Sequence, residues 1–187
     1  MDASAEGAHS MNIKLDGTFD FCATCAANNN CCVRTRHNYG QVANPPLLPH
    51  EGEMIAAVTG LGIDEFTEST VPEGNGLAIK RAGAGGYFYQ GGRCAIYSAR
   101  PFDCRIFPFD VIEHEGELHW IVYTNLCPVD FDYNRYLASA KEVLRDSNVS
   151  EEELVAFTRH GRDVMAPHPF RVLEPVVLGL LREKASV

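Results

Sequence analysis

The chain has 187 residues and a formal net charge of −9, with 45% hydrophobic and 22% charged residues. A chain of this length and composition can bury an apolar core without disulfide bonds, which excludes the disordered and collagen-like classes. Its acidic balance argues against nucleic acid as a partner, because affinity for the phosphate backbone requires a basic surface.

The N-terminal residues lack the features of a secretory signal. Segment 1–11 is small and polar and carries Asp2 and Glu6, where a signal has a basic region followed by an apolar core. The longest apolar run, at 176–181, is much shorter than the roughly 18 residues that span a membrane. We therefore expect a cytoplasmic protein with no membrane partner, in which residues 1–19 form a flexible tail.

The first group of cysteines follows this tail and comprises Cys22, Cys25, Cys31 and Cys32. The spacing of the first two places two sulfurs on one tight turn, which is a common local unit of zinc and iron–sulfur sites. Because adjacent cysteines usually point in different directions, the last two could serve different metals, or one could be a core residue. In a reducing cytosol, such clustered thiols are more often metal ligands or redox groups than disulfides.

Two short helices are predicted next. Pro49 is typical of the first residue of a helix, and Gly60 is typical of its end. The apolar residues expected on one face of this helix are Met54, Ile55 and Val58. Asp64 is a candidate N-cap for a second helix that runs through Phe66.

From Leu77 the sequence changes to short β-prone runs separated by glycine. The runs span 77–81, 87–90, 93–97, 107–113 and 118–123. Segment 114–117, which contains Gly116, predicts a hairpin turn. We interpret the whole region as a small antiparallel meander.

Helical patterns return after Cys127. Asn134 is a candidate N-cap, and Ser150 with Glu153 forms a capping-box pattern for the following helix. The residues expected to face inward on the first of these helices are Leu137, Ala140, Val143 and Leu144. Pro175 predicts the start of a last helix rich in valine and leucine.

These elements predict an α+β fold: a small antiparallel β-meander, a cysteine-rich metal-binding N-terminal half and a C-terminal helical layer. The expected organisation is a flexible N-terminal tail at 1–19, a cysteine-cluster metal-binding domain at 20–130, and a C-terminal helical extension at 131–187 packed on it.

All seven cysteines lie at or before residue 127, the last three being Cys94, Cys104 and Cys127. One tetrahedral zinc ion or one [4Fe–4S] cluster takes four thiolates, and two zinc ions that share a bridging thiolate would take all seven. The count leaves these alternatives open. For Cys94 or Cys127 taken alone, a buried core thiol is the simpler interpretation, because free cysteine behaves as a small hydrophobe.

Arginines accompany the cysteines. Five of them lie within four residues of a cysteine: Arg34, Arg36, Arg93, Arg100 and Arg105. Guanidinium groups offset the negative charge of thiolates and lower thiol pKa values, so we regard Arg100 and Arg105 as candidate cofactor-binding residues. The alternative is that these arginines are solvated surface residues.

Segment 94–109 reads C-A-I-Y-S-A-R-P-F-D-C-R-I-F-P-F. It resembles the C-x-I-Y-x-x-R-P-x-x-C-R-x-F-P-F signature of the YkgJ-type cysteine-cluster proteins, the CxxCxxCC family described as zinc- or iron-chelating. With the upstream cysteines and the pair Cys127-Pro128, the resemblance covers residues 20–128, although the gap between Cys25 and Cys31 is longer than in the family.

The resemblance implies that one set of thiolates forms the family's metal site: Cys22, Cys25, Cys31, Cys32, Cys94, Cys104 and Cys127. Arg100-Pro101 is expected to fix an extended turn that brings Cys104 back toward the strand of Cys94. Aromatic residues of the motif are expected to pack around the site: Tyr97, Phe107 and Phe109. A relative of the family, a flagellin lysine N-methylase, has a similar cysteine cluster thought to hold an iron–sulfur centre, which favours iron over zinc.

Three functions follow as hypotheses. The first is a structural or electron-transfer protein that holds an iron–sulfur cluster, most simply 4Fe-4S, or zinc, because a site closed by protein thiolates has no open position for substrate. The second is a cluster-dependent enzyme, such as a protein-modifying enzyme, with His37, His119 or Asp103 as acid or base. The third is a thiol redox protein in which Cys31 or Cys32 resolves a disulfide at the first cysteine pair. The sequence does not identify a protein partner.

Overall fold

The computed structural model describes residues 43–70, 76–82, 85–91, 93–126 and 132–177. This part of the chain combines helices with antiparallel strands, which confirms the α+β class. Within it, no helix is both long enough and apolar enough to cross a membrane. The predicted flexible tail at 1–19 lies outside the described residues.

Helix α2 forms close to the predicted position but spans Glu51–Thr59, so Pro49 precedes the helix and is not its first residue. The predicted end is confirmed, since Gly60 takes the left-handed conformation with φ of 73°. The predicted apolar face is wrong in part. Ile55 is fully buried, whereas Met54 and Val58 are exposed to 38% and 61%. The buried stripe instead runs through Glu51, Gly52 and Ile55, so the inward face is rotated from the predicted one.

Helix α3 (Ile63–Phe66) also forms, but Gly62 takes the N-cap position in place of the predicted Asp64. The backbone N–H of Gly62 donates to Glu65 Oε1 at 2.7 Å. Asp64 lies in the first turn of the helix, where its charge faces the positive end of the helix dipole.

The predicted meander is divided into separate small sheets. Three of these sheets are two-stranded and antiparallel: β1 (Thr67–Ser69) with β2 (Leu77–Ile79), β3 (Arg81–Ala82) with β4 (Gly85–Gly86), and β5 (Tyr89–Gln90) with β6 (Arg93–Cys94).

Two short helical segments follow β6: the 3₁₀ helix η1 (Tyr97–Ala99) and helix α4 (Phe102–Ile106). Between them Arg100 and Pro101 are extended, with ψ of 138° and 161°, which confirms the extended turn predicted before Cys104. The location of Cys104 on a helix was not predicted.

The main sheet has the order β7-β8-β9 and is antiparallel, with β7 (Phe109–His114), β8 (Glu117–Tyr123) and β9 (Phe170–Pro175). The hairpin turn between β7 and β8 confirms the prediction, since Glu115 and Gly116 take positive φ angles of 54° and 86°. The predicted start of the last helix at Pro175 is wrong, because Pro175 ends β9. The chain from residue 178 onward, where the rest of this helix was predicted, lies outside the described residues. Strand β9 pairs with the open edge of β8, for example Val172 with Ile121.

Three helices complete the described part: α5 (Tyr133–Asp146), α6 (Glu151–Thr158) and α7 (Arg162–Met165). Asp132, and not the predicted Asn134, caps α5, since its carboxylate accepts the backbone N–H groups of Asn134 and Arg135. The predicted capping box of Ser150 and Glu153 is confirmed at the start of α6. The inward face of α5 is confirmed for Leu137, Ala140 and Leu144, while Val143 is only partly buried.

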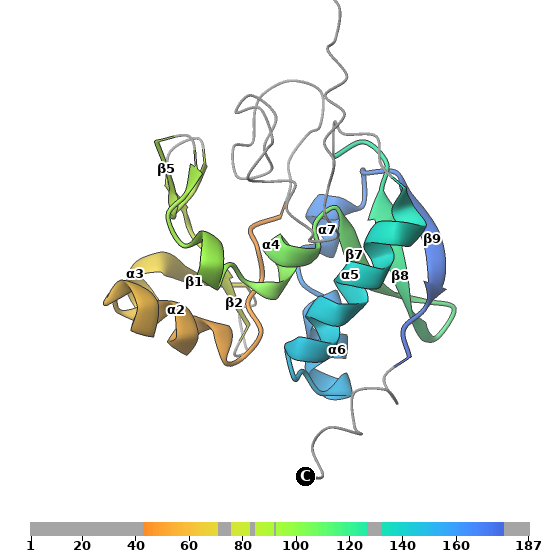
Figure 1. Cartoon of the computed structure of the whole chain (residues 1–187), viewed down its shortest axis with the longest axis horizontal. Helices are drawn as coiled ribbons and strands as arrows, with labels where there is room; N and C mark the ends of the chain where they lie inside the picture. Colours follow the sequence, from red (N-terminus) through yellow and green to blue (C-terminus); the bar gives the residue numbers. More distant parts are fainter. Residues whose placement is uncertain (1–42, 71–75, 83–84, 92, 127–131, 178–187) are drawn as a thin grey trace, which may run out of the picture.

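Alternate residues of β8 face two different cores. Trp120 and Val122 join α5 and α6 in one core, and Ile121 and Tyr123 join Met165 of α7 in another. A third core lies among α2, α3 and the small hairpins. Figure 1 shows these hairpins, α2 and α3 on one side of α4, and the main sheet with α5 on the other.

Candidate functional site

Two of the seven predicted metal ligands fall in the described part of the chain. Cys94 lies on β6 and Cys104 on α4, and both are half-buried. The other predicted ligands lie outside the described residues and stay predictions: Cys22, Cys25, Cys31, Cys32 and Cys127.

Cys94 is anchored through the β5–β6 hairpin. It pairs with Tyr89 across the hairpin, and the next residue, Ala95, donates its backbone N–H to the carbonyl of Phe88 at 2.8 Å. Phe88 and Ile96 are buried in the core beside α2, and Cys94 packs against the edge of this core. The hairpin therefore holds Cys94 at the periphery of the core.

Cys104 is anchored through α4. Phe102 and Ile106, one helical turn apart, are fully buried in the core of the main sheet. Cys104 lies between them in sequence and stays partly exposed. The helix thus fixes the backbone of Cys104 without enclosing its thiol.

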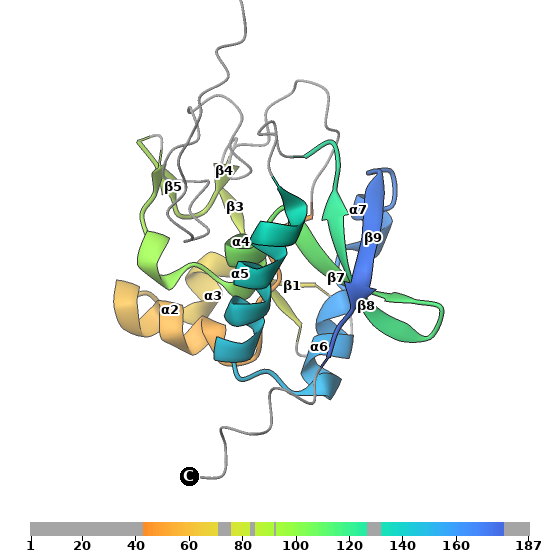
Figure 2. The ribbon, with the colours of Figure 1, turned by 45° about the vertical axis from the view of Figure 1, so that its right-hand side comes forward.

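Leu126, the last described residue before Cys127, is buried against Tyr123 and Met165. Phe107, which follows α4, and Ala43, the first described residue of the chain, pack against the same cluster. In Figures 1 and 2 the β5–β6 hairpin and the C-terminal end of β8 both lie toward the top of the view. The fold therefore directs the two segments to one side of the molecule.

The two candidate arginines have defined neighbours. The guanidinium carbon of Arg100 lies 3.6 Å from the centroid of the Tyr97 ring, and its Nε donates to the Tyr97 carbonyl at 2.9 Å. Arg105 lies near enough to Glu51 to lower the pKa of that carboxyl. A role of either arginine toward a metal group stays a prediction.

Glu51 joins the start of α2 to the start of α4. Its Oε2 accepts the backbone N–H of Leu48 at 2.8 Å, and its Oε1 accepts the backbone N–H of Phe102 at 2.5 Å. The side chain is only 3% exposed. Burial raises the pKa of Glu51 to about 7, although the two N–H donors and Arg105 act in the opposite direction.

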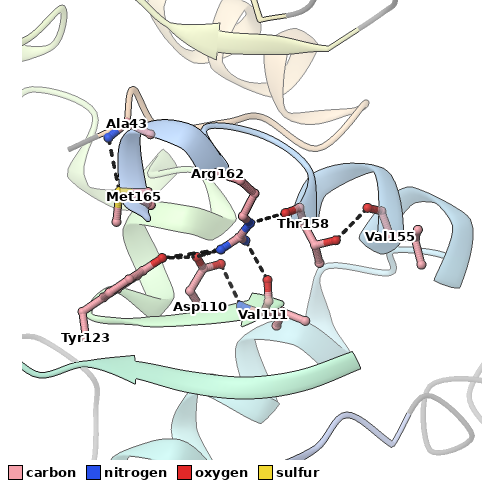
Figure 3. A network of polar contacts seen from close by, with 8 residues as sticks. All are labelled: Ala43, Asp110, Val111, Tyr123, Val155, Thr158, Arg162 and Met165. Atoms are coloured by element: carbon pink, nitrogen blue, oxygen red, sulfur yellow. Dashed lines mark hydrogen bonds and ion pairs between the residues drawn. The ribbon is translucent and has the colours of Figure 1, made fainter. Parts of the chain in front are cut away.

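A polar network joins β7, β8, α6 and α7 (Figure 3). Arg162 Nη1 lies 3.1 Å from Asp110 Oδ2, and Arg162 Nη2 donates to the carbonyl of Val111 at 2.9 Å. Tyr123 donates its hydroxyl to the same Asp110 oxygen at 3.0 Å, and Arg162 Nε donates to the carbonyl of Thr158. Burial and the nearby charge of Asp110 raise the pKa of Tyr123, which keeps its proton.

A cavity of about 30 Å³ borders this network. Its polar lining consists of Asp103, Asp110, Tyr123, His160 and Arg162. Burial, together with the negative charges of Asp110 and Glu51, raises the pKa of Asp103, whereas burial lowers the pKa of His160. The volume suits about two water molecules.

The other predicted acid–base residues lie elsewhere. His119 lies near the start of β8, at the opposite end of the strand from Leu126, and its ring is 5.6 Å from that of His114. His37 lies outside the described residues.

Whether the described residues suit a metal ion depends on the chemistry of their donor atoms. No metal-binding group of three or more histidine, cysteine, aspartate or glutamate side chains occurs among the described residues, which lie within 43–126 and 132–177. Cys94 and Cys104 carry soft sulfur atoms, a donor type that suits zinc or iron–sulfur chemistry. A complete site therefore needs ligands from the cysteines that lie outside the described residues.

The sequence did not identify several polar residues that are buried, Glu51 and Asp110, or half-buried, His160 and Arg162. Each acts through a partner that is distant in sequence, as with Glu51 and Phe102. No local pattern marks such contacts, because a glutamate in the first turn of a helix is ordinarily a solvated residue near the helix dipole.

Comparisons with protein-family models, with curated proteins and with solved structures found no match to this chain. The resemblance of segment 94–109 to the YkgJ-type signature therefore stays a prediction from the sequence.

Proposed function

We propose that this protein binds a metal centre, an iron–sulfur cluster or zinc, through the thiolates of its clustered cysteines, in a structural or electron-transfer role. The observation that carries the proposal is the location of Cys94 and Cys104. They come from two separate elements, each anchored in a core, and both keep partial exposure.

Partial exposure favours a ligand over a core residue. Cysteine is among the residues most often fully buried when it serves only in packing. Within the described part of the chain, no cysteine is among the buried members of a core, and Cys94 only borders one. Their location therefore supports, for both residues, a role beyond filling space.

At such a centre, the cysteines and arginines of this chain would have different roles. Cys94 and Cys104 would each supply a thiolate, and further thiolates would come from the five other cysteines. Arg100 and Arg105 would offset the negative charge of these ligands. A bound iron–sulfur cluster would supply one-electron transfer, whereas zinc would supply only a structural cross-link.

The cavity beside Asp103 gives little support to the alternative of a cluster-dependent enzyme. Its volume of about 30 Å³ among the described residues suits water molecules. An acid–base role for Asp103 would need a substrate site larger than this cavity, to which residues beyond the described ones would have to contribute.

The first experiment is to purify the protein anaerobically without added metal. Iron, zinc and acid-labile sulfide are then measured per chain together with the visible spectrum. Iron with sulfide and a sulfide-to-iron charge-transfer band would support the cluster, and a colourless protein with zinc would support the zinc form. A protein that contains neither metal would contradict the proposal and favour thiol redox chemistry.

Matched variants assign the ligands. Cys94→Ser and Cys104→Ser are each expected to lower the metal content per chain or its retention against a chelator. Ser98→Ala, at an exposed position between the two cysteines, is the control and should retain the wild-type content. Equal metal content in all three variants would remove Cys94 and Cys104 from the site.

A further inference from the structure

The carboxylate of Glu51 binds two backbone N–H groups that lie far apart in the sequence. One belongs to Leu48, just before α2, and the other to Phe102, the first residue of α4. The side chain is 3% exposed, so water does not compete for either bond. Glu51 is thus a buried connection between two helices.

The bond to Phe102 satisfies a group that its own helix cannot. The first N–H groups of a helix have no acceptor within the helix, and burial without an acceptor is costly. Pro101, which precedes Phe102, has a side chain that offers no acceptor. The distant carboxylate of Glu51 takes this role, and bonds to a charged acceptor are stronger than neutral ones.

Helix α4 depends on such tertiary contacts. It has only five residues, which is too short for a helix to be stable on its own. The helix is held in place by the buried side chains of Phe102 and Ile106 and by the hydrogen bond from the backbone N–H of Phe102 to Glu51. Cys104 and Arg105 lie on this same helix.

We infer that Glu51 is a positioning residue, whose carboxylate fixes the first turn of α4 against the start of α2 and thereby places Cys104 for ligation. The consequence for ligation rests on the proposed metal function. The effect on the backbone of α4 and on the accessibility of Cys104 does not, so the two can be tested separately.

The first test requires no metal. Glu51→Gln keeps the shape of the side chain, but its amide nitrogen cannot accept an N–H, so one of the two bonds is lost. The matched control is Glu53→Gln on the same helix, where Glu53 is exposed. Tryptophan fluorescence of the single, buried Trp120 verifies that each variant is folded.

Two readouts follow. At about pH 8, where Glu51 is ionised, hydrogen exchange of the peptide that contains the Phe102 amide should accelerate about tenfold or more in Glu51→Gln, which corresponds to the loss of a charge-assisted hydrogen bond. Alkylation of Cys104 relative to Cys94 in the same molecule should rise several-fold. Glu53→Gln should change neither readout. Unchanged exchange, or a constant ratio of Cys104 to Cys94 labelling, would overturn the inference.

The second test uses Co²⁺ as a spectroscopic probe of bound thiolates. The thiolate-to-cobalt charge-transfer spectrum of Glu51→Gln should shift toward that of Cys104→Ser, while Glu53→Gln should match the wild type. A wild-type spectrum in Glu51→Gln would overturn the inference and leave the metal function standing. Absence of a thiolate band in the wild-type protein would instead contradict the metal function, and the exchange and labelling results would then decide the inference.

Discussion

Arg162 and Asp110 form an ion pair between α7 and β7, with Nη1 and Oδ2 3.1 Å apart. The other nitrogens of this guanidinium bind backbone carbonyls, that of Val111 on β7 and that of Thr158 at the end of α6. The side chain of Arg162 therefore links the α6–α7 turn to β7 (Figure 3). Strand β7 lies at the edge of the main sheet.

Substitution of Arg162 by lysine should be destabilising although the charge is retained. The lysine ammonium is a single point charge and cannot reproduce a planar group bound to three separate acceptors. Loss of part of this network should lower the free energy of unfolding by about 2 kcal/mol. The loss should be smaller than for a fully buried ion pair, because the Arg162 side chain is 31% exposed. Urea unfolding followed by Trp120 fluorescence measures the change.

Arg159→Lys is the matched control, because Arg159 is exposed one turn away. It should leave the unfolding midpoint within experimental error. If the two lysine variants unfolded at the same urea concentration, the network would have no role in stability.

Gly161 and Ala43 meet where α7 begins. Gly161 has φ of 64°, and a Cβ atom on this residue would overlap the Cβ of Ala43. Gly161→Ala therefore combines a left-handed backbone with a steric clash, and should lower the free energy of unfolding by about 2 kcal/mol or more.

Gly60→Ala isolates the backbone part of this effect. Gly60 also has a positive φ, of 73°, but a Cβ atom added to this residue would have no neighbouring atom within 4 Å among the described residues. Its substitution should cost only about 1 kcal/mol. Ala43→Gly should partly restore the stability of Gly161→Ala, and a lack of rescue in this double mutant would place the clash elsewhere.

The cap of α5 provides a further test. Asp132 accepts two backbone N–H groups at the start of this helix, whereas the side chain of Asn134 lies beyond the cap position. Asp132→Ala should lower the free energy of unfolding by about 1 kcal/mol, and Asn134→Ala by much less. Thermal unfolding of both variants measures the difference, and a larger loss for Asn134→Ala would reverse the assignment of the cap.

Local sequence patterns predicted the elements that local interactions determine. The Ser150–Glu153 capping box and the turn at Glu115 and Gly116 are confirmed because each depends on a few adjacent residues. The end of β9 was predicted as the start of a helix, because a short apolar run suits either structure. Its pairing with β8, about fifty residues earlier in the sequence, decides the outcome.

The candidate site shows the same limit. The sequence identified Cys94 and Cys104 by residue type and spacing, and Asp103 as an acidic neighbour. It could not show that Asp103 borders a cavity, or that Glu51 reaches the first N–H of α4. These contacts form between residues that are far apart in the sequence, so they arise only when the chain is folded.

Glu51 also predicts how stability varies with pH. Burial raises its pKa in the folded protein from 4.5 to about 7. Between these values the folded state retains a proton that the unfolded state has released, so stability should fall as pH rises. The contribution is fully present below pH 4.5 and is lost above about pH 7, and its size is about 3 kcal/mol.

Glu51→Gln cannot ionise and should lack this decline. The difference in the free energy of unfolding between wild type and variant should therefore shift by about 3 kcal/mol in favour of the variant from pH 4.5 to about pH 8. Asp103 titrates in both proteins, so the difference reports chiefly on Glu51. Urea unfolding at a series of pH values measures both curves, and parallel curves would show that Glu51 is already ionised in the folded protein at acidic pH.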